Sequence, residues 1–171
     1  MKLLAIDTSG DACSAALFLD GVIEQRLDPT PRRHGELLLP MMQALLESAG
    51  IGLDALDAIA FGRGPGSFTG VRIAVAVAQG GAFGAGCPTV PVSTLAAMAV
   101  GEYRRTGRRR VLAALDARMG EVYWGVYERS GTRAWSRYAA RNWYHRRGWS
   151  RCRKAAAGAG SVRAGVPIGR R

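Results

Sequence analysis

The sequence is short of cysteine, histidine and long hydrophobic runs. Its 171 residues include only Cys13, Cys87 and Cys152, which lack the spacing of a metal site or a redox pair, and two histidines. An odd number of cysteines without a secretion signal favours reduced thiols. The first apolar run ends at Asp7, too soon for a signal peptide, and no stretch is long enough to cross a membrane. These absences predict a cytoplasmic protein with no membrane segment.

Acidic residues are absent after Glu128. Residues 1–128 carry 12 basic and 13 acidic side chains with both signs interspersed, as in an ordinary globular domain. Residues 129–171 carry 12 basic side chains, no acidic one and no leucine, so the formal net charge of +11 belongs to this segment. The segment also lacks apolar periodicity. We therefore expect 129–171 to be disordered.

Two explanations for this basic segment stay open. Arg, Gly, Ala and Trp are what a GC-rich gene yields when it is read out of frame, which would place a frameshift between about 129 and 134. Alternatively, three of the four tryptophans lie among the arginines, and such a segment can bind RNA through phosphate contacts and base stacking.

The densest local signal is GRGPGSFTGVR at residues 62–72, a glycine-rich loop between an apolar run and a helix of small residues. Glycine suits backbone that needs positive φ or that another chain or ligand approaches closely. We expect Ser67 or Thr69 to cap the helix, and Gly64, Gly66 and Ser67 to be candidate contacts for an anion or a partner. The loop has neither a Walker lysine nor dinucleotide-loop spacing. Tight packing is the alternative.

Apolar periodicity and turn signals predict an α/β fold. Strands are expected at 2–7, 13–19 and 22–27, with a hairpin turn at Asp20-Gly21. A helix should follow within 34–50, and it should either start close to Leu38 or contain a kink, because Pro40 is tolerated only near a first turn. The remaining elements are a strand at 57–61, a helix at 69–84, a strand at 89–92, a helix at 94–103 and a hairpin over 111–127.

This order of elements resembles the actin/Hsp70-like (ASKHA) nucleotide-binding lobe, a mixed sheet flanked by helices. Such a lobe begins with a strand followed by an acid and a small hydroxyl residue, here Asp7, Thr8 and Ser9. These three residues are weak candidates for cofactor contacts. The alternative is that Asp7 is simply a turn residue at the end of a strand.

Two helices carry more apolar surface than one buried face needs. Leu37 and Leu39 widen the stripe of the first helix, and the second is apolar almost all round. We expect an association surface on them, unless both are sandwiched within the fold. The predicted surface consists of Leu38, Met41, Met42, Leu45, Val71 and Val75.

Catalytic and metal-binding patterns are missing from the sequence. The segment around Ser67 is not the G-x-S-x-G elbow of a nucleophile, and no Ser/His/Asp or Cys/His set is present. One histidine outside the basic segment cannot hold a metal without a carboxylate cluster. We predict no catalytic residue, metal or cofactor, and interpret His34 as a cap or polar contact at a helix start.

Five ordered motifs resemble the TsaB (YeaZ) family of bacterial tRNA threonylcarbamoyladenosine biosynthesis proteins. They are AIDTS at 5–9, HGELLLP at 34–40, GRGPGSFTGVRI at 62–73, PVSTL at 91–95 and ALDARMGEVYW at 114–124. The resemblance runs from Met1 to about Glu128. It implies a first lobe with dimerisation helices at 1–103 and the start of an incomplete second lobe at 104–128.

The resemblance also implies a function. Members of this family pair with a TsaD-like catalytic subunit, which transfers threonylcarbamoyl to adenosine 37 of ANN-decoding tRNAs, and a TsaE-like ATPase joins them. The chain would then be a non-catalytic scaffold that pairs with TsaD or with a second copy of itself and meets tRNA only through the complex. An ATP-hydrolysing or phosphotransfer enzyme of the same superfamily is the alternative, and a basic RNA-binding protein is a third hypothesis.

Overall fold

The computed structural model describes residues 1–171 except 31, 119–120, 131–133 and 142–171. The chain divides into two compact units, Met1–Thr94 and Leu95–Arg171. The first unit contains β1 (Lys2–Asp7), β2 (Cys13–Leu19), β3 (Val22–Asp28), α1 (His34–Ser48), the short 3-10 helix η1 (Leu53–Ala55), β4 (Ala58–Gly62), α2 (Phe68–Ala85) and β5 (Thr89–Val92). The second contains β6 (Arg110–Arg118), β7 (Glu121–Ser130) and β8 (Ala134–Arg141), preceded by α3 (Thr94–Thr106).

The sheet of the first unit has the strand order β3-β2-β1-β4-β5. β1, β2 and β3 form the predicted antiparallel meander, and the turn between β2 and β3 lies at Asp20-Gly21, with φ of 47° and 98°. Positive φ at both central residues is typical of a type I′ turn, whose backbone twist matches the twist of the two strands of a hairpin. β4 and β5 are parallel to β1. The carboxyl ends of β1, β4 and β5 therefore meet at one edge of the sheet.

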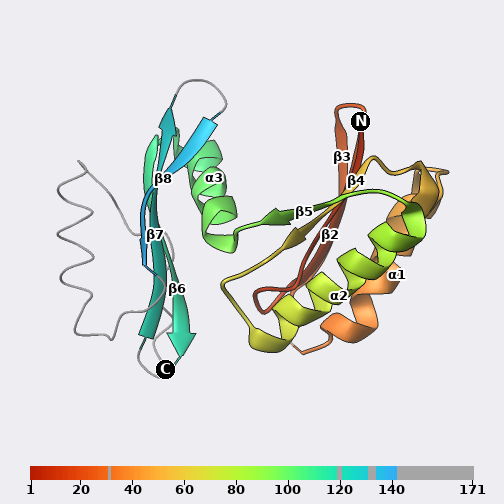
Figure 1. Ribbon diagram of the computed structural model, residues 1–171, viewed down its shortest axis with the longest axis horizontal. Coiled ribbons are helices and arrows are strands. Elements are labelled where there is room, and N and C mark those ends of the chain that lie inside the picture. Colours follow the sequence, from red (N-terminus) through yellow and green to blue (C-terminus); the bar gives the residue numbers. More distant parts are fainter. Residues whose placement is uncertain (31, 119–120, 131–133, 142–171) are drawn as a thin grey trace. The chain divides into compact units, whose positions relative to one another are not determined.

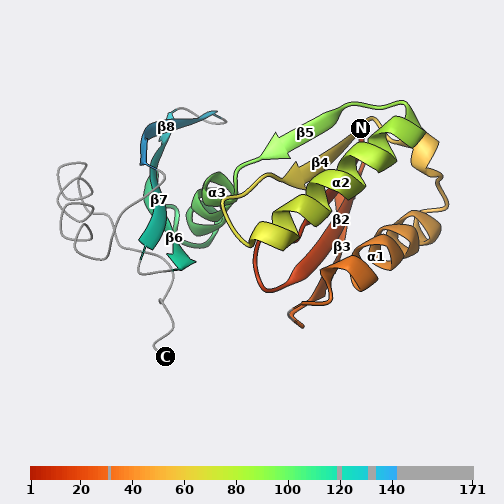
Figure 2. The same cartoon turned by 60° about the horizontal axis from the view of Figure 1, so that its bottom comes forward.

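Helices α1 and α2 run beside each other on one face of this sheet (Figures 1 and 2). Alternate residues of the strands point toward them, as the period of two in a strand requires. The resulting core includes Leu4, Ile6, Leu17, Leu38, Leu45 and Ile59, all nearly inaccessible to solvent. No helix among the described residues is long and apolar enough to cross a membrane.

The first helix begins earlier than the sequence predicted. α1 starts at His34 rather than close to Leu38, so Pro40 lies inside it. A proline in a helix interior removes one backbone hydrogen bond. The apolar face compensates, because Leu38, Met42 and Leu45 are all buried in the core of the unit. Tertiary packing here outweighs the local preference of proline.

The second unit has a three-stranded antiparallel sheet in the order β6-β7-β8. α3 belongs to this unit, because Leu95 and Ala99 pack in one core with Val111, Ala113 and Tyr127. The division between the two units lies at 94/95, before the predicted lobe boundary at 103/104. Composition alone could not show which sheet this helix packs on.

Part of the segment predicted to be disordered has regular structure. β7 continues to Ser130, and β8 pairs with it over 134–141. The prediction is therefore wrong for these residues. Backbone pairing in a sheet needs no apolar periodicity in its edge strand. Residues 131–133 and 142–171 lie outside the described residues, and the frameshift hypothesis stays a prediction.

Candidate functional site

The candidate site forms where the loop after β1 meets the glycine-rich loop after β4. β1 and β4 are parallel neighbours with Ile6 opposite Phe61, so Asp7 and Gly62 lie side by side at the same sheet edge. The sequence had singled out both loops separately. The strand order brings them together.

Asp7 acts as a turn residue in this loop. Its Oδ1 accepts hydrogen bonds from the N–H of Ser9 at 2.8 Å and from the hydroxyl of Ser9 at 2.7 Å. Such a carboxylate contact with the residue two positions on is a recurrent way to stabilise a tight turn. The alternative interpretation of Asp7 is thus supported by its hydrogen bonds.

Three glycines in and beside the second loop are needed because this segment packs tightly against the loop after β1. A Cβ at Gly62 would overlap with Oδ2 of Asp7, one at Gly66 with the carbonyl oxygen of Ser9, and one at Gly70 with that of Thr8. Gly64 has a φ of 82°, which side chains rarely adopt. These glycines permit close packing within the protein, which was the alternative to phosphate binding.

Hydrogen bonds fasten the two loops together. The N–H of Ser67 donates to the carbonyl of Ser9 at 2.7 Å, and the buried hydroxyl of Thr8 donates to the carbonyl of Gly70 at 2.6 Å. Ser67 is the N-cap of α2, as predicted, and accepts from the N–H of Gly70 at 3.2 Å. The hydroxyl of Ser67 is therefore used to cap α2.

Thr94 completes the junction, and our sequence-based interpretation missed it. Its hydroxyl donates to the hydroxyl of Ser9 at 3.1 Å, and its N–H donates to the carbonyl of Gly64 at 3.0 Å. A small hydroxyl residue at the start of a predicted helix, within the PVSTL motif, was the only available signal. Its partners come from two loops distant in sequence.

This arrangement offers limited chemistry. One half-buried carboxylate and three buried or half-buried hydroxyls, from Thr8, Ser9 and Thr94, bond chiefly to the protein itself. Within the described part of the chain, no cluster of three or more His, Cys, Asp or Glu residues could hold a metal ion. His34 is the first residue of α1, but it does not cap the helix: Arg33 is the N-cap, without a side-chain cap bond, and the Nδ1 of the buried His34 has no hydrogen-bond partner in the structure.

A buried thiol lies on the neighbouring strand. Cys13 is inaccessible to solvent on β2. Burial raises the pKa of its thiol, and the charges of Asp28 and Asp7 raise it further. A thiol shifted in this direction is a poor nucleophile at neutral pH. Cys13 is therefore a core residue.

The structure divides the predicted association surface. Leu38, Met42 and Leu45 face the sheet and are buried in the core of their own unit, which corrects the prediction that they lie on the surface. Met41, Val71 and Val75 are partly accessible. An α/β sheet has to be covered by the apolar face of its helices, and this requirement takes the deepest residues of the stripe.

Other apolar side chains, outside the predicted surface, remain exposed on these helices. Leu39 on α1 is 57% exposed, and Phe68 and Phe83 on α2 are 74% and 92% exposed. Ala76, Gly80 and Gly84 also lie on the outside of α2, at intervals of four residues. The helical spacing of these residues in the sequence could have revealed this exposed face, if the residues that face the sheet had been identified first.

Comparisons with known proteins identify the family of the chain. Residues 28–141 match the family model described as TsaD: tRNA N6-adenosine threonylcarbamoyltransferase. This match runs beyond Glu128, near which the sequence resemblance ended. The tRNA threonylcarbamoyladenosine biosynthesis protein TsaB of Escherichia coli (strain K12) is 52% identical over 135 residues, which are 79% of this chain and 58% of that protein.

Two further relatives agree. The TsaB protein of Haemophilus influenzae is 46% identical over 134 residues, covering 78% of this chain and 57% of that protein. The solved structure of YeaZ from Pseudomonas aeruginosa has a TM-score of 0.74 and 47% identity, covering 84% of this chain and 71% of that one. The chain thus spans somewhat more than half the length of these curated relatives. The predicted mixed sheet flanked by helices, of the actin/Hsp70-like type, is confirmed by the fold and this neighbour, and the chain belongs to the TsaB (YeaZ) family.

Proposed function

We propose that this chain takes part in the biosynthesis of threonylcarbamoyladenosine in tRNA, as a partner subunit without a catalytic group of its own. The observation that carries the proposal is the 52% identity to a protein named for that biosynthesis. The chain spans 58% of the length of that relative.

The geometry of the loop junction supports a subunit without catalytic activity of its own. Asp7 is engaged by Ser9, and the backbone of residues 8 and 9 fills the space beside Gly66 and Gly70. In a phosphate-binding loop, glycines leave that space for the ligand. An ATP-hydrolysing enzyme would need an open cradle at this position, so the junction favours the scaffold over the alternative function.

The outer faces of α1 and α2 support association with a TsaD-like catalytic subunit. Leu39, Phe68 and Phe83 expose apolar area, and a Cβ at Gly80 or Gly84 would have no atom within 4 Å. Small residues beside large exposed apolar ones allow a partner helix to approach closely. Met41, Val71 and Val75 would border this contact. A second copy of the chain is the competing occupant, and a TsaE-like ATPase would join the complex.

Reconstitution tests the proposal. The purified chain is mixed with a TsaD-like protein, a TsaE-like protein, a threonylcarbamoyl donor and an unmodified ANN-decoding tRNA, and the nucleosides are analysed by mass spectrometry. We expect product only when the chain is present, and no ATP hydrolysis by the chain alone. Product that forms equally well without the chain would refute the proposal. ATP turnover by the isolated chain would instead support the enzyme alternative.

A further inference from the structure

Positive charge is concentrated where α3 ends and β6 begins. Six arginines and two carboxylates lie in this region of the second unit. We call this surface the arginine turn, and it comprises Arg104, Arg105, Arg108, Arg109, Arg110 and Arg129. Residues 1–94, by contrast, carry 6 basic and 9 acidic side chains. The charge is therefore local to this turn within the globular part of the chain.

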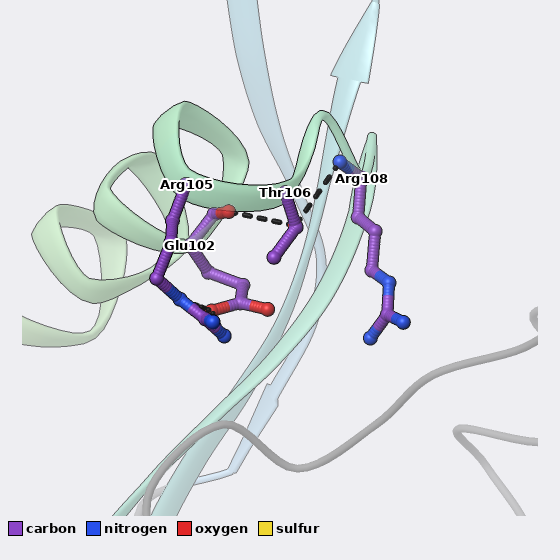
Figure 3. Close-up of polar contacts among 4 residues, drawn as sticks. All are labelled: Glu102, Arg105, Thr106 and Arg108. Carbon is purple, nitrogen blue, oxygen red and sulfur yellow. Dashed lines mark hydrogen bonds and ion pairs between the residues drawn. The ribbon is translucent and has the colours of Figure 1, made fainter.

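The backbone of the turn is held by three hydrogen bonds. The N–H of Gly107, whose φ is 73°, donates to the carbonyl of Tyr103 at 2.7 Å and ends the helix. The hydroxyl of Thr106 donates to the carbonyl of Glu102 at 2.8 Å and accepts from the N–H of Arg108 at 3.4 Å (Figure 3). Arg105 and Arg108 thus project from an ordered turn.

The neighbouring strand adds a further cation to the turn. The N–H of Arg129 on β7 donates to the carbonyl of Arg109 at 2.8 Å. The guanidinium carbon of Arg129 lies 4.0 Å from the centre of the Tyr103 ring, a cation–π contact. Residues from α3, the turn and β7 therefore contact one another in this region.

The two carboxylates neutralise only part of this charge. Glu102 pairs with Arg105 at 2.7 Å, and Glu128 pairs with Arg110 at 2.8 Å. Arg104, Arg108 and Arg109 are exposed and have no ion pair within the described residues. A helix C-terminus favours cations, which explains Arg104. It does not explain two further arginines placed after the helix has ended.

We propose that the arginine turn binds the phosphate backbone of tRNA directly. Guanidinium groups match phosphate oxygens with paired hydrogen bonds, and several of them on one ordered surface fit a ligand with regularly spaced anions. Such contacts position a nucleic acid without reading its sequence. The choice of tRNA as the RNA rests on the proposed function. The charge and geometry of the turn do not depend on it.

Salt-dependent binding to an unmodified tRNA transcript tests this inference on the full chain. The test variant replaces three exposed arginines of the turn: Arg104→Gln, Arg108→Gln and Arg109→Gln. The matched control removes the same charge from exposed arginines of the first unit: Arg32→Gln, Arg63→Gln and Arg72→Gln. Both variants lose three positive charges and keep every basic residue of 129–171. The contribution of that segment to tRNA binding is therefore the same in both.

The turn variant should lose affinity by about tenfold or more at physiological salt. Its plot of log K against log salt should be shallower by about 2, because each phosphate contact contributes roughly 0.7–0.9 to the slope. The control should keep the parent slope. Equal losses in both variants, or no measurable binding of the parent, would overturn the proposal.

A membrane surface is the other polyanion that such a turn could meet. Vesicles containing phosphatidylserine are therefore titrated with the same three proteins. Loss of vesicle binding with unchanged tRNA binding in the turn variant would also overturn the proposal. The binding assay needs no partner protein, so failed reconstitution of tRNA modification would refute the proposed function and leave the result for the arginine turn intact.

Discussion

The carbonyl of Ser9 accepts a hydrogen bond from the N–H of Ser67 at 2.7 Å, and this contact joins the loop after β1 to the loop after β4. Gly66, one residue earlier, lies so close to the same carbonyl that an added Cβ would overlap with it. Because the atoms that the Cβ would meet include the backbone oxygen and carbon of Ser9, no side-chain rotation could make room for it. The two loops therefore depend on glycine at this position.

Gly66→Ala should destabilise the protein by about 1–3 kcal/mol, because one of the two loops has to move. Urea unfolding followed by circular dichroism would measure the change in midpoint. Gly10→Ala is the matched control, since a Cβ there meets no atom within 4 Å, and it should stay within about 0.5 kcal/mol of the parent. Equal midpoints for the two variants would contradict the close packing.

Thr8→Val should cost about 1–3 kcal/mol of folding free energy. The hydroxyl of Thr8 is fully buried and donates to the carbonyl of Gly70 at 2.6 Å, so the variant leaves a buried acceptor without its partner. Thr8→Ser keeps the hydroxyl and should recover part of the loss. A valine variant as stable as the parent would show that the carbonyl finds another donor.

Gly80→Ala should stabilise the protein by up to about 1 kcal/mol, because alanine favours a helix over glycine and the added methyl group has free space. Gly81→Ala is the comparison. Its Cβ would lie 3.2 Å from Cδ1 of Ile59, so this variant should gain less or lose stability. Thermal unfolding of both variants measures the difference, and a larger gain at Gly81 would contradict the orientation of α2.

The stability of the protein should fall at alkaline pH in a way that depends on Cys13. Burial, with Asp28 and Asp7, raises the pKa of this thiol in the folded state. The folded chain thus keeps its proton where the unfolded chain releases it, and the contribution is lost as pH rises from about 8.5 through the raised value. Urea midpoints between pH 7 and pH 10 should decline less for Cys13→Ala. If the urea midpoints of the parent and of Cys13→Ala changed equally with pH, Cys13 would make no contribution to the pH dependence of stability.

Leu39→Glu should weaken association with a TsaD-like partner by at least tenfold, about 1.4 kcal/mol, without unfolding the chain. Its side chain is 57% exposed on α1, and a charge in an apolar interface is left unpaired. Ile23→Glu on β3, 59% exposed, is the matched control and should associate normally. Sedimentation measures pairing, and circular dichroism checks the fold.

Leu45→Glu separates the core from the surface of the same helix. Leu45 is fully buried, so this variant should fail to fold, and its loss of pairing would say nothing about the interface. A folded Leu45→Glu protein, or a Leu39→Glu protein that pairs as tightly as the parent, would place the association surface elsewhere.

Local chemistry made the elements of the first unit predictable. The turn at Asp20-Gly21, the cap at Ser67 and the strand ending at Asp7 all follow from interactions within a few residues. Helix boundaries were less predictable, because Pro40 argues locally for a late start and the buried face of α1 overrides it. The strand β8 was missed altogether, since its pairing with β7 is a backbone interaction that composition does not reveal.

Five ordered motifs in the sequence indicated the family. Turn residues, caps and apolar periods predicted the α/β class and the order of elements, because these signals act over short distances. Only the tertiary structure decided what the glycines are for, which face of α1 is free and which unit α3 joins. Those answers depend on contacts such as Gly66 with Ser9 and Leu95 with Val111, between residues that strand order and packing bring together. A single sequence shows each of these residues but not its neighbour in space.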